Sequence, residues 1–128
     1  VNFSRNFIYS TALETHNLLS VKHTYFYLQS NINQLFSLFN LNKYFKFKAN
    51  DLKSSFEVRG DGPIYGIIVP DNKKCKDLAV YLQNHNLDVR AILSPTVPKG
   101  TERLRVILHS FNTTAEIDQL FSLLTDYK

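Results

Sequence analysis

A short apolar run that ends at a proline most constrains how this chain can fold. Residues 64–69 read IYGIIV, and Pro70 follows directly. A run of this length, rich in β-branched residues, is typical of a buried strand. Asp71 can then cap the N-terminus of a helix. The apolar stripe of that helix consists of Cys75, Leu78, Ala79 and Leu82. The sequence therefore predicts a buried strand followed at once by an amphipathic helix.

Two further strands are predicted in the second half of the chain. Residues 89–93 form one of them, and residues 103–109 form the other. In the latter, Leu104, Val106 and Leu108 alternate with other residues, as expected for a strand with one buried face. Between the two strands, residues 94–100 read SPTVPKG. We expect an ordered loop there, because two prolines fix φ and the glycine supplies a turn.

A final helix is predicted after the last strand. Thr113 and Glu116 have the spacing of a capping box, which marks a helix N-terminus. The residues expected to face inward are Ile117, Leu120, Phe121 and Leu124.

The first half of the chain predicts two helices. Their apolar stripes are Leu18, Val21, Tyr25 and Leu28 in the first, and Ile32, Leu35, Phe36 and Phe39 in the second. Both sets follow a 3.6-residue period. Residues 48–63 read as irregular chain with turn signals at residues 60–63. A short strand around residues 56–58 is an alternative for part of this segment. The predicted order is two helices and then β-α-β-β-α, an α+β layer with helices on one face of a small sheet.

Composition excludes several classes of protein. The 128 residues suit one domain, and an apolar fraction of 44% with 20% charged residues is that of a globular chain. No apolar run approaches the roughly 20 residues of a membrane-spanning helix, and no signal peptide is expected. Cys75 is the one cysteine, so we expect no disulfide, no metal site and a cytoplasmic protein. Because the chain begins with Val1 and contains no Met, we expect a fragment of a longer protein.

Arg105 is the first candidate for a binding residue. The alternation of residues 103–109 places Arg103, Arg105, Ile107 and His109 on the face opposite the apolar one. An arginine fixed on a strand presents a planar fork that suits a carboxylate or a phosphate. The alternative is an exposed arginine in a cross-strand ion pair. His109 is a weaker candidate on the same face, whereas Cys75 is expected to be a packed thiol.

A basic and aromatic cluster suggests a second hypothesis. The net charge is +4, and the cluster consists of Lys43, Tyr44, Phe45, Lys46, Phe47, Lys48 and Lys53. Lysines interleaved with aromatic rings can bind single-stranded nucleic acid. We favour a solvated lysine face with aromatics in the core, because no recognition-helix or glycine-rich pattern accompanies the cluster.

Several blocks of the sequence resemble a known family. The strongest is PTVPKGTERLRV at residues 95–106, preceded by VRAI at residues 89–92. FSRNFIYSTAL at residues 3–13, IIVPDN at residues 67–72 and the helix at residues 114–124 also fit. These blocks resemble the C-terminal domain of the α-oxoamine synthases, in particular their biotin-pathway branch. The resemblance covers nearly the whole chain and is loose between about residues 30 and 60.

The resemblance implies a fold and a reaction. The fold is the small C-terminal domain of the aspartate aminotransferase-like pyridoxal-phosphate enzymes, known as fold type I. Residues 1–45 would be a helical segment linking from a missing cofactor domain, and residues 46–128 the small domain. The parent would be a homodimeric acyltransferase. It would condense L-alanine with a pimeloyl thioester, with loss of carbon dioxide, to give 8-amino-7-oxononanoate.

The resemblance also implies roles for particular residues. Arg105 matches the arginine that binds the substrate α-carboxylate, and Thr96 matches the loop lining the acyl-substrate pocket. Ser10 and Thr11 match the pair that reaches the cofactor phosphate of the neighbouring subunit. One departure bears on the acyl substrate: Leu93-Ser94 stand where many biotin-pathway members have Arg-Pro.

The chain also lacks residues that the family's chemistry needs. The lysine that binds pyridoxal phosphate lies upstream in the family, so we expect no catalytic residue, no bound cofactor and no activity in this chain alone. Partners other than the substrates and a second subunit, such as nucleic acid or a membrane, are not expected. Two alternatives remain: a free-standing carboxylate-binding regulatory module, or another α-oxoamine synthase such as a glycine C-acetyltransferase.

Overall fold

The computed structural model describes residues 13–52 and 56–127. The helices are α1 (Thr15–Ser30), α2 (Ile32–Leu52), α3 (Asn72–Asn84) and α4 (Thr114–Asp126). The strands are β1 (Val58–Arg59), β2 (Ile64–Ile68), β3 (Arg90–Ile92) and β4 (Arg103–Ile107). Residues 1–33 and residues 34–128 form two compact units. None of the described helices is long and apolar enough to cross a membrane.

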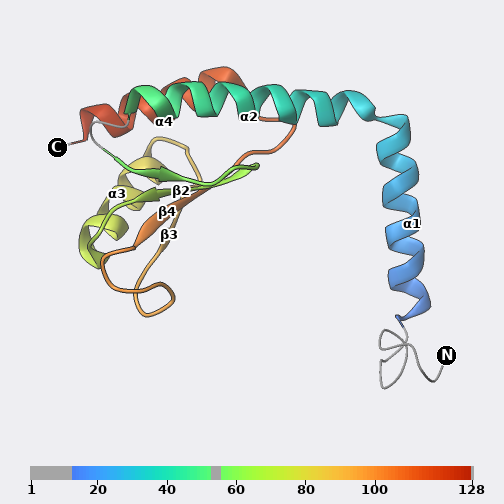
Figure 1. The fold of residues 1–128 in the computed structure, drawn as a ribbon, viewed down its shortest axis with the longest axis horizontal. Helices are drawn as coiled ribbons and strands as arrows, with labels where there is room; N and C mark the ends of the chain where they lie inside the picture. The colour runs from blue at the N-terminus through green and yellow to red at the C-terminus, as the bar shows by residue number, and fades with distance from the viewer. Residues whose placement is uncertain (1–12, 53–55, 128) are drawn as a thin grey trace. The chain divides into compact units, whose positions relative to one another are not determined.

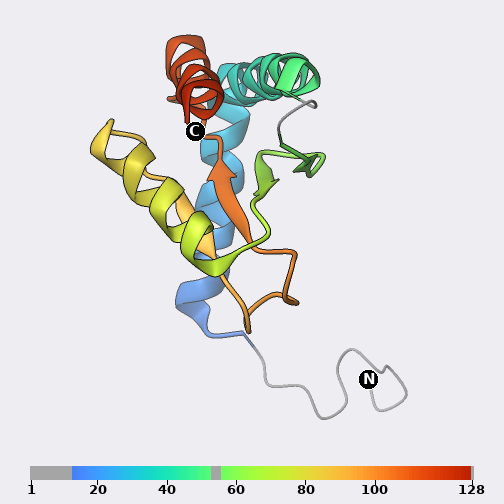
Figure 2. The same ribbon diagram turned by 90° about the vertical axis from the view of Figure 1, so that its left-hand side faces the viewer.

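The second unit is built on a four-stranded antiparallel sheet in the order β1-β2-β4-β3. The inward side chains of the sheet, such as Ile67 and Leu104, join residues of α2, α3 and α4 in one core. In the figures, α2 and α4 lie side by side, and α3 runs along the sheet (Figures 1 and 2). The helices therefore cover one face of the sheet, as the sequence predicts.

Two helices follow the sequence prediction closely. Asp71 caps α3, because its side chain accepts a hydrogen bond from the Lys74 N–H at 2.8 Å. The capping box of Thr113 and Glu116 opens α4. The predicted stripes of both helices are buried: Cys75, Leu78, Ala79 and Leu82 in α3, and Ile117, Leu120, Phe121 and Leu124 in α4. A clear 3.6-residue period against a single core explains this agreement.

The helix α2 differs from the prediction in length and in packing face. It extends to Leu52, so residues 48–52 are helical and not irregular. Its buried residues are Leu41, Phe45 and Ala49, which are spaced four apart and pack into the sheet core. The predicted stripe of Ile32, Leu35, Phe36 and Phe39 is exposed instead, at 44–60% of each side chain's accessible surface.

The sheet has one strand more than the three strands of the predicted β-α-β-β-α order. The alternative strand near residues 56–58 exists as β1, and Val58 and Arg59 pair with Ile67 and Gly66 of β2. The strand predicted for residues 64–69 is buried from Tyr65 onward, whereas Ile64 at its start is half exposed.

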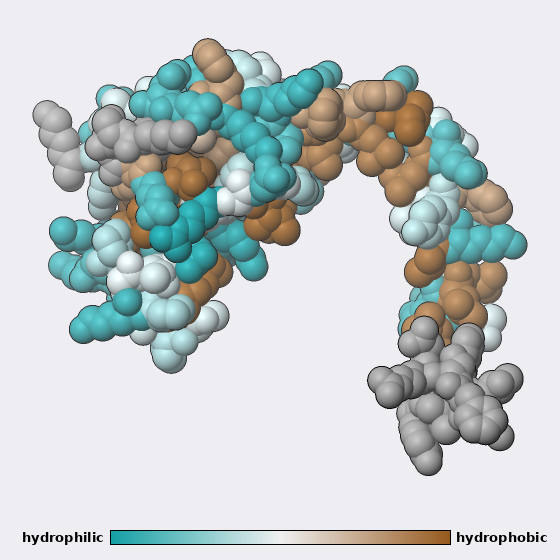
Figure 3. All heavy atoms as spheres, viewed as in Figure 1, coloured by the Kyte–Doolittle hydropathy of each residue, from teal (hydrophilic) through white to brown (hydrophobic). Residues whose placement is uncertain are grey.

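The first unit contains α1, which buries none of its residues. Apolar side chains lie along it, including Leu18, Val21, Tyr25 and Phe26, each at least half exposed (Figure 3). The predicted helix is present, but its apolar stripe has no core to face within the described residues.

Candidate carboxylate-binding site

The candidate site lies on the face of the sheet that no helix covers. The register of the three strand pairs aligns Arg59 of β1, Gly66 of β2, Arg105 of β4 and Arg90 of β3 in one row. Residues directly opposite each other in antiparallel strands project to the same face. Leu104 and Val106 point into the core, which leaves Arg105 exposed on the open face, as predicted.

The three arginines of this row differ in their partners. The Nε of Arg59 lies 2.6 Å from Oε1 of Glu57, and this contact lowers the pKa of the Glu57 carboxyl. The Nε of Arg90 lies 2.8 Å from Oδ1 of Asp88. The side chain of Arg105 has neither an ion pair nor a hydrogen bond with any described residue. The cross-strand ion pair that the alternative reading of Arg105 requires is not found among the described residues.

Gly66 lies opposite Arg105 in the sheet and makes room for the stem of Arg103. The two residues are direct partners in the β2–β4 pair, where opposing Cβ atoms are normally only about 5 Å apart. A Cβ at position 66 would lie 3.1 Å from Cδ of Arg103, whose stem passes over the glycine. The stem of Arg103 thus occupies the space that a side chain at position 66 would fill. An unpaired guanidinium on a rigid strand is suited to binding a carboxylate.

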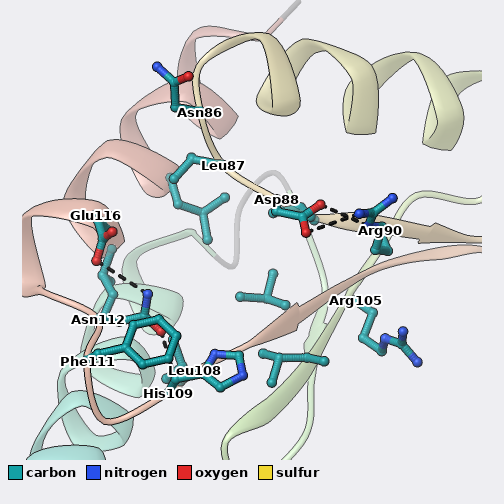
Figure 4. A pocket seen from close by; sticks show the side chains of 15 residues that line it. Asn86, Leu87, Asp88, Arg90, Arg105, Leu108, His109, Phe111, Asn112 and Glu116 are labelled. Atoms are coloured by element: carbon teal, nitrogen blue, oxygen red, sulfur yellow. Dashed lines mark hydrogen bonds and ion pairs between the residues drawn. The ribbon is translucent and has the colours of Figure 1, made fainter.

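A cavity of about 510 Å³ borders Arg105 at the end of β4. Its apolar lining includes Leu87, Leu108 and Leu120. At its rim the rings of His109 and Phe111 stack with their centroids 4.9 Å apart (Figure 4). His109 lies beyond the end of β4, is exposed and lines this cavity together with Arg105, and its ring is stacked on a phenyl group.

Thr96 lies in the loop that connects β3 to β4. Its side chain is exposed, and its hydroxyl makes no hydrogen bond to a described residue. The strand that follows the loop carries Arg105, so one connection links both predicted substrate residues. Ser10 and Thr11, the predicted phosphate ligands, lie outside the described residues.

Cys75 and part of the basic cluster are engaged in structural contacts, whereas Lys53 lies outside the described residues. Cys75 is completely buried, and burial raises the pKa of its thiol to about 11. In the basic cluster, Lys46 pairs with Asp61. Lys48 pairs with Asp118 of α4 at 2.6 Å. The aromatic rings of the cluster divide between core and surface: Phe45 is fully buried, and Phe47 is 63% exposed.

Sequence comparisons identify the chain's relatives. No family model matches the chain. An 8-amino-7-oxononanoate synthase of Emericella nidulans is 35% identical over 137 residues, which span 99% of this chain and 32% of the relative. The enzyme of the same name from Vibrio parahaemolyticus is 29% identical over 92% of this chain and 30% of its own length. The chain is a relative of the 8-amino-7-oxononanoate synthases. It spans about a third of the length of these curated relatives.

Solved structures show the fold. The 8-amino-7-oxononanoate synthase from Francisella tularensis superposes with a TM-score of 0.69 over 98% of this chain and 36% of that structure, at 23% identity. A serine palmitoyltransferase from S. paucimobilis superposes with a TM-score of 0.70 over 95% of this chain, at 18% identity. The latter was solved with an aldimine of pyridoxal phosphate and myriocin. The chain therefore has the fold of the small domain of these fold type I enzymes, as the resemblance implied.

The sequence analysis did not predict the contacts of Asn72 and Glu102 or the place of Gly66. Asn72 and Glu102 fasten the loop that carries Thr96, and Gly66 lies opposite Arg105 under the stem of Arg103. Only the register of β2 against β4 shows the place of Gly66, and no periodicity within one strand contains that information.

Proposed function

We propose that this chain is the carboxylate-binding small domain of a pyridoxal-phosphate dependent acyltransferase. The parent protein would condense L-alanine with a pimeloyl thioester and release carbon dioxide, forming 8-amino-7-oxononanoate. The observation that carries the proposal is the unpaired guanidinium of Arg105, opposite Gly66 on the open face of the sheet. The relatives named 8-amino-7-oxononanoate synthase support the choice of reaction, because they match 90–99% of this chain.

The described residues of this chain do not fit a covalent site for pyridoxal phosphate. A lysine that forms a Schiff base is normally desolvated, with a lowered pKa. Here, Lys46 and Lys48 have pKa values raised by their hydrogen bonds to Asp61 and Asp118, and the other described lysines are exposed. We therefore assign the cofactor to the part of the parent protein outside this chain, and the homodimer stays a prediction.

In the proposed reaction, Arg105 holds the α-carboxylate of the amino acid. Two parallel N–H···O bonds from the guanidinium would fix the plane of the carboxylate and hence the orientation of the bonds at Cα. The strand β4 lies between β2 and β3, so the arginine starts from a fixed backbone. Arg59 and Arg90 cannot serve equally well, because each is already neutralised by its own carboxylate.

Substitution of Arg105 in the full-length protein tests this assignment. Arg105→Ala should raise the KM for alanine by about 30- to 150-fold, equivalent to about 2–3 kcal/mol of lost charge-assisted binding. Arg59→Ala is the matched control, because it removes an arginine of the same row that is already paired with Glu57. Steady-state kinetics of both variants provide the measurement. An Arg105→Ala enzyme with an unchanged KM for alanine would show that another group binds the carboxylate.

The identity of the substrates needs a separate assay. Leu93-Ser94 differ from the Arg-Pro that many biotin-pathway members have at this place. The second candidate is therefore the activity of another α-oxoamine synthase, such as a glycine C-acetyltransferase. Full-length protein should be assayed with alanine, glycine and serine against acetyl, pimeloyl and palmitoyl thioesters. The proposal expects the highest kcat/KM with alanine and the pimeloyl thioester.

A further inference from the structure

The loop between β3 and β4 is fastened at its start by one asparagine. Asn72, the first residue of α3, bonds both backbone groups of Ser94: Nδ2 donates to the Ser94 carbonyl at 3.3 Å, and the Ser94 N–H donates to Oδ1 at 2.9 Å. Asn72 and Ser94 are 22 residues apart in sequence. A side-chain amide that both donates and accepts in this way pairs with the backbone much as a neighbouring strand would.

The same loop is fastened at its end by a buried carboxylate. Glu102 is 2% exposed, the one charged side chain that is buried among the described residues. Its Oε2 accepts a hydrogen bond from the Gly100 N–H at 2.8 Å. Gly100 has a φ of +86°, a conformation that other residues adopt only with strain. A buried carboxylate loses its hydration, and this loss is costly unless protein hydrogen bonds replace it. The hydrogen bond from the Gly100 N–H provides such a replacement, and keeping it defines the geometry of the turn.

Between the two anchors the loop is held by its own backbone. The Val97 N–H donates to the Leu93 carbonyl at 3.2 Å. The N–H and the hydroxyl of Thr101 both donate to the Pro98 carbonyl, at 3.0 and 2.7 Å. Within the described residues, the hydroxyls of Ser94 and Thr96 have no hydrogen-bond partner, and of these two residues only Thr96 is exposed. A rigid frame around an exposed, unpartnered hydroxyl is the arrangement expected of a preorganised binding residue.

We propose that Asn72 and Glu102 are positioning residues that hold the Thr96 hydroxyl for the acyl thioester substrate. Neither residue is proposed to touch the substrate. They act through the backbone of residues 94–101, which they fix from opposite ends. The proposal rests on the proposed function for the identity of the substrate, whereas the rigidity of the loop follows from the contacts alone.

Substitution of Asn72 in the full-length protein is the first test. Asn72→Leu has a similar volume and removes both hydrogen bonds to Ser94, so the KM for the acyl thioester should rise about tenfold or more. The KM for alanine should change less than twofold, because Arg105 lies on a different element. Asn84→Leu, at the exposed C-terminal end of the same helix, is the matched control. The acyl thioester KM of Asn72→Asp should fall between those of Asn72→Leu and Asn84→Leu, because the carboxylate still accepts a hydrogen bond from the Ser94 N–H.

Substitution of Glu102 gives a rescue test at the other anchor. Glu102→Leu removes the acceptor for the Gly100 N–H and should raise the acyl KM. Glu102→Gln keeps an acceptor oxygen of the same size and should restore the wild-type value. If Glu102→Gln and Glu102→Leu have the same KM, the hydrogen bond to Gly100 has no role in positioning.

A structural measurement separates this proposal from the proposed function. Amide hydrogen exchange of residues 94–101 in the full-length protein should accelerate at least tenfold in Asn72→Leu, and should not change in Asn84→Leu. Unchanged exchange in Asn72→Leu would overturn the proposal even in an inactive protein. Faster exchange with an unchanged acyl KM would also overturn it, because the loop would then be held for folding only. A wild-type protein without acyltransferase activity would refute the proposed function and leave the exchange test valid.

Discussion

The thiol of Cys75 gives a prediction at the scale of one residue. Its pKa is raised from 9.0 to about 11, chiefly by burial and further by the negative charge of Glu102. The unfolded chain therefore loses the thiol proton near pH 9, whereas the folded chain keeps it until near pH 11. The protonated thiol therefore contributes its full stabilisation of the fold below pH 9. As the pH rises to 11 this contribution is lost, which lowers the unfolding free energy by about 2–3 kcal/mol.

Urea unfolding at pH 8.0 and at pH 10.5 checks this expectation. The drop in the unfolding free energy between the two pH values should be larger for the wild-type chain than for Cys75→Ala, which has no thiol to ionise. Tyrosines and lysines titrate in both proteins, so their contribution cancels in the comparison. Equal drops in the two proteins would contradict the raised pKa.

At this scale the sequence predicts the face on which a side chain lies better than it predicts the residues that the side chain contacts. The period of residues 103–109 correctly places Arg105 on the open face, and the period of α3 correctly places Cys75 in the core. Neither pattern shows which arginine is neutralised. Asn72 bonds a residue 22 positions away, and such a contact exists only once the sheet and the loop have formed. Site residues that act through distant backbone are therefore the ones that periodicity misses.

At the scale of elements, α2 is attached to the sheet by one aromatic side chain. Phe45 is fully buried and stacks on Tyr65 with ring centroids 4.2 Å apart. It also contacts the ring of Phe121 in α4, at 5.1 Å. Phe45→Ala should lower the unfolding free energy by about 3–5 kcal/mol, because it removes a large buried side chain and leaves a cavity. Phe47→Ala, two residues along the same helix and 63% exposed, is the matched control.

Chemical denaturation of the two phenylalanine variants distinguishes the two faces of α2. The Phe47→Ala protein should stay within about 0.5 kcal/mol of the wild type. Equal losses in both variants would mean that the helix packs differently from the structure described above.

The error in predicting α2 has a physical origin. The helix carries apolar residues on more than one face, and the sequence alone cannot tell which face meets the core. The row that is buried includes the small residue Ala49 and lies among lysines, so it has a weaker pattern than the stripe from Ile32 to Phe39. The helices α3 and α4 each carry one apolar stripe with polar residues around it, and both were predicted correctly.

At the scale of the whole molecule, the two compact units should differ in stability. The core of residues 34–128 draws on α2, α3, α4 and the sheet, and every member of it lies at or beyond Leu38. The helix α1 has 16 residues, none of them buried. An isolated helix of this length is only marginally stable in water. Its apolar side chains would also favour association with other protein surfaces.

A truncated chain of residues 34–128 tests this division. Because no core residue is lost, its unfolding free energy should equal that of the 128-residue chain within about 0.5 kcal/mol. A triple variant, Leu18→Lys, Val21→Lys, Tyr25→Lys, tests the apolar side chains of α1. In light scattering after gel filtration, the average molar mass of the 128-residue chain should exceed that of the triple variant at the same concentration, because the variant associates less. A truncated chain that is several kcal/mol less stable would show that residues 1–33 contribute to the core. An unchanged association in the triple variant would show that the apolar side chains of α1 do not drive it.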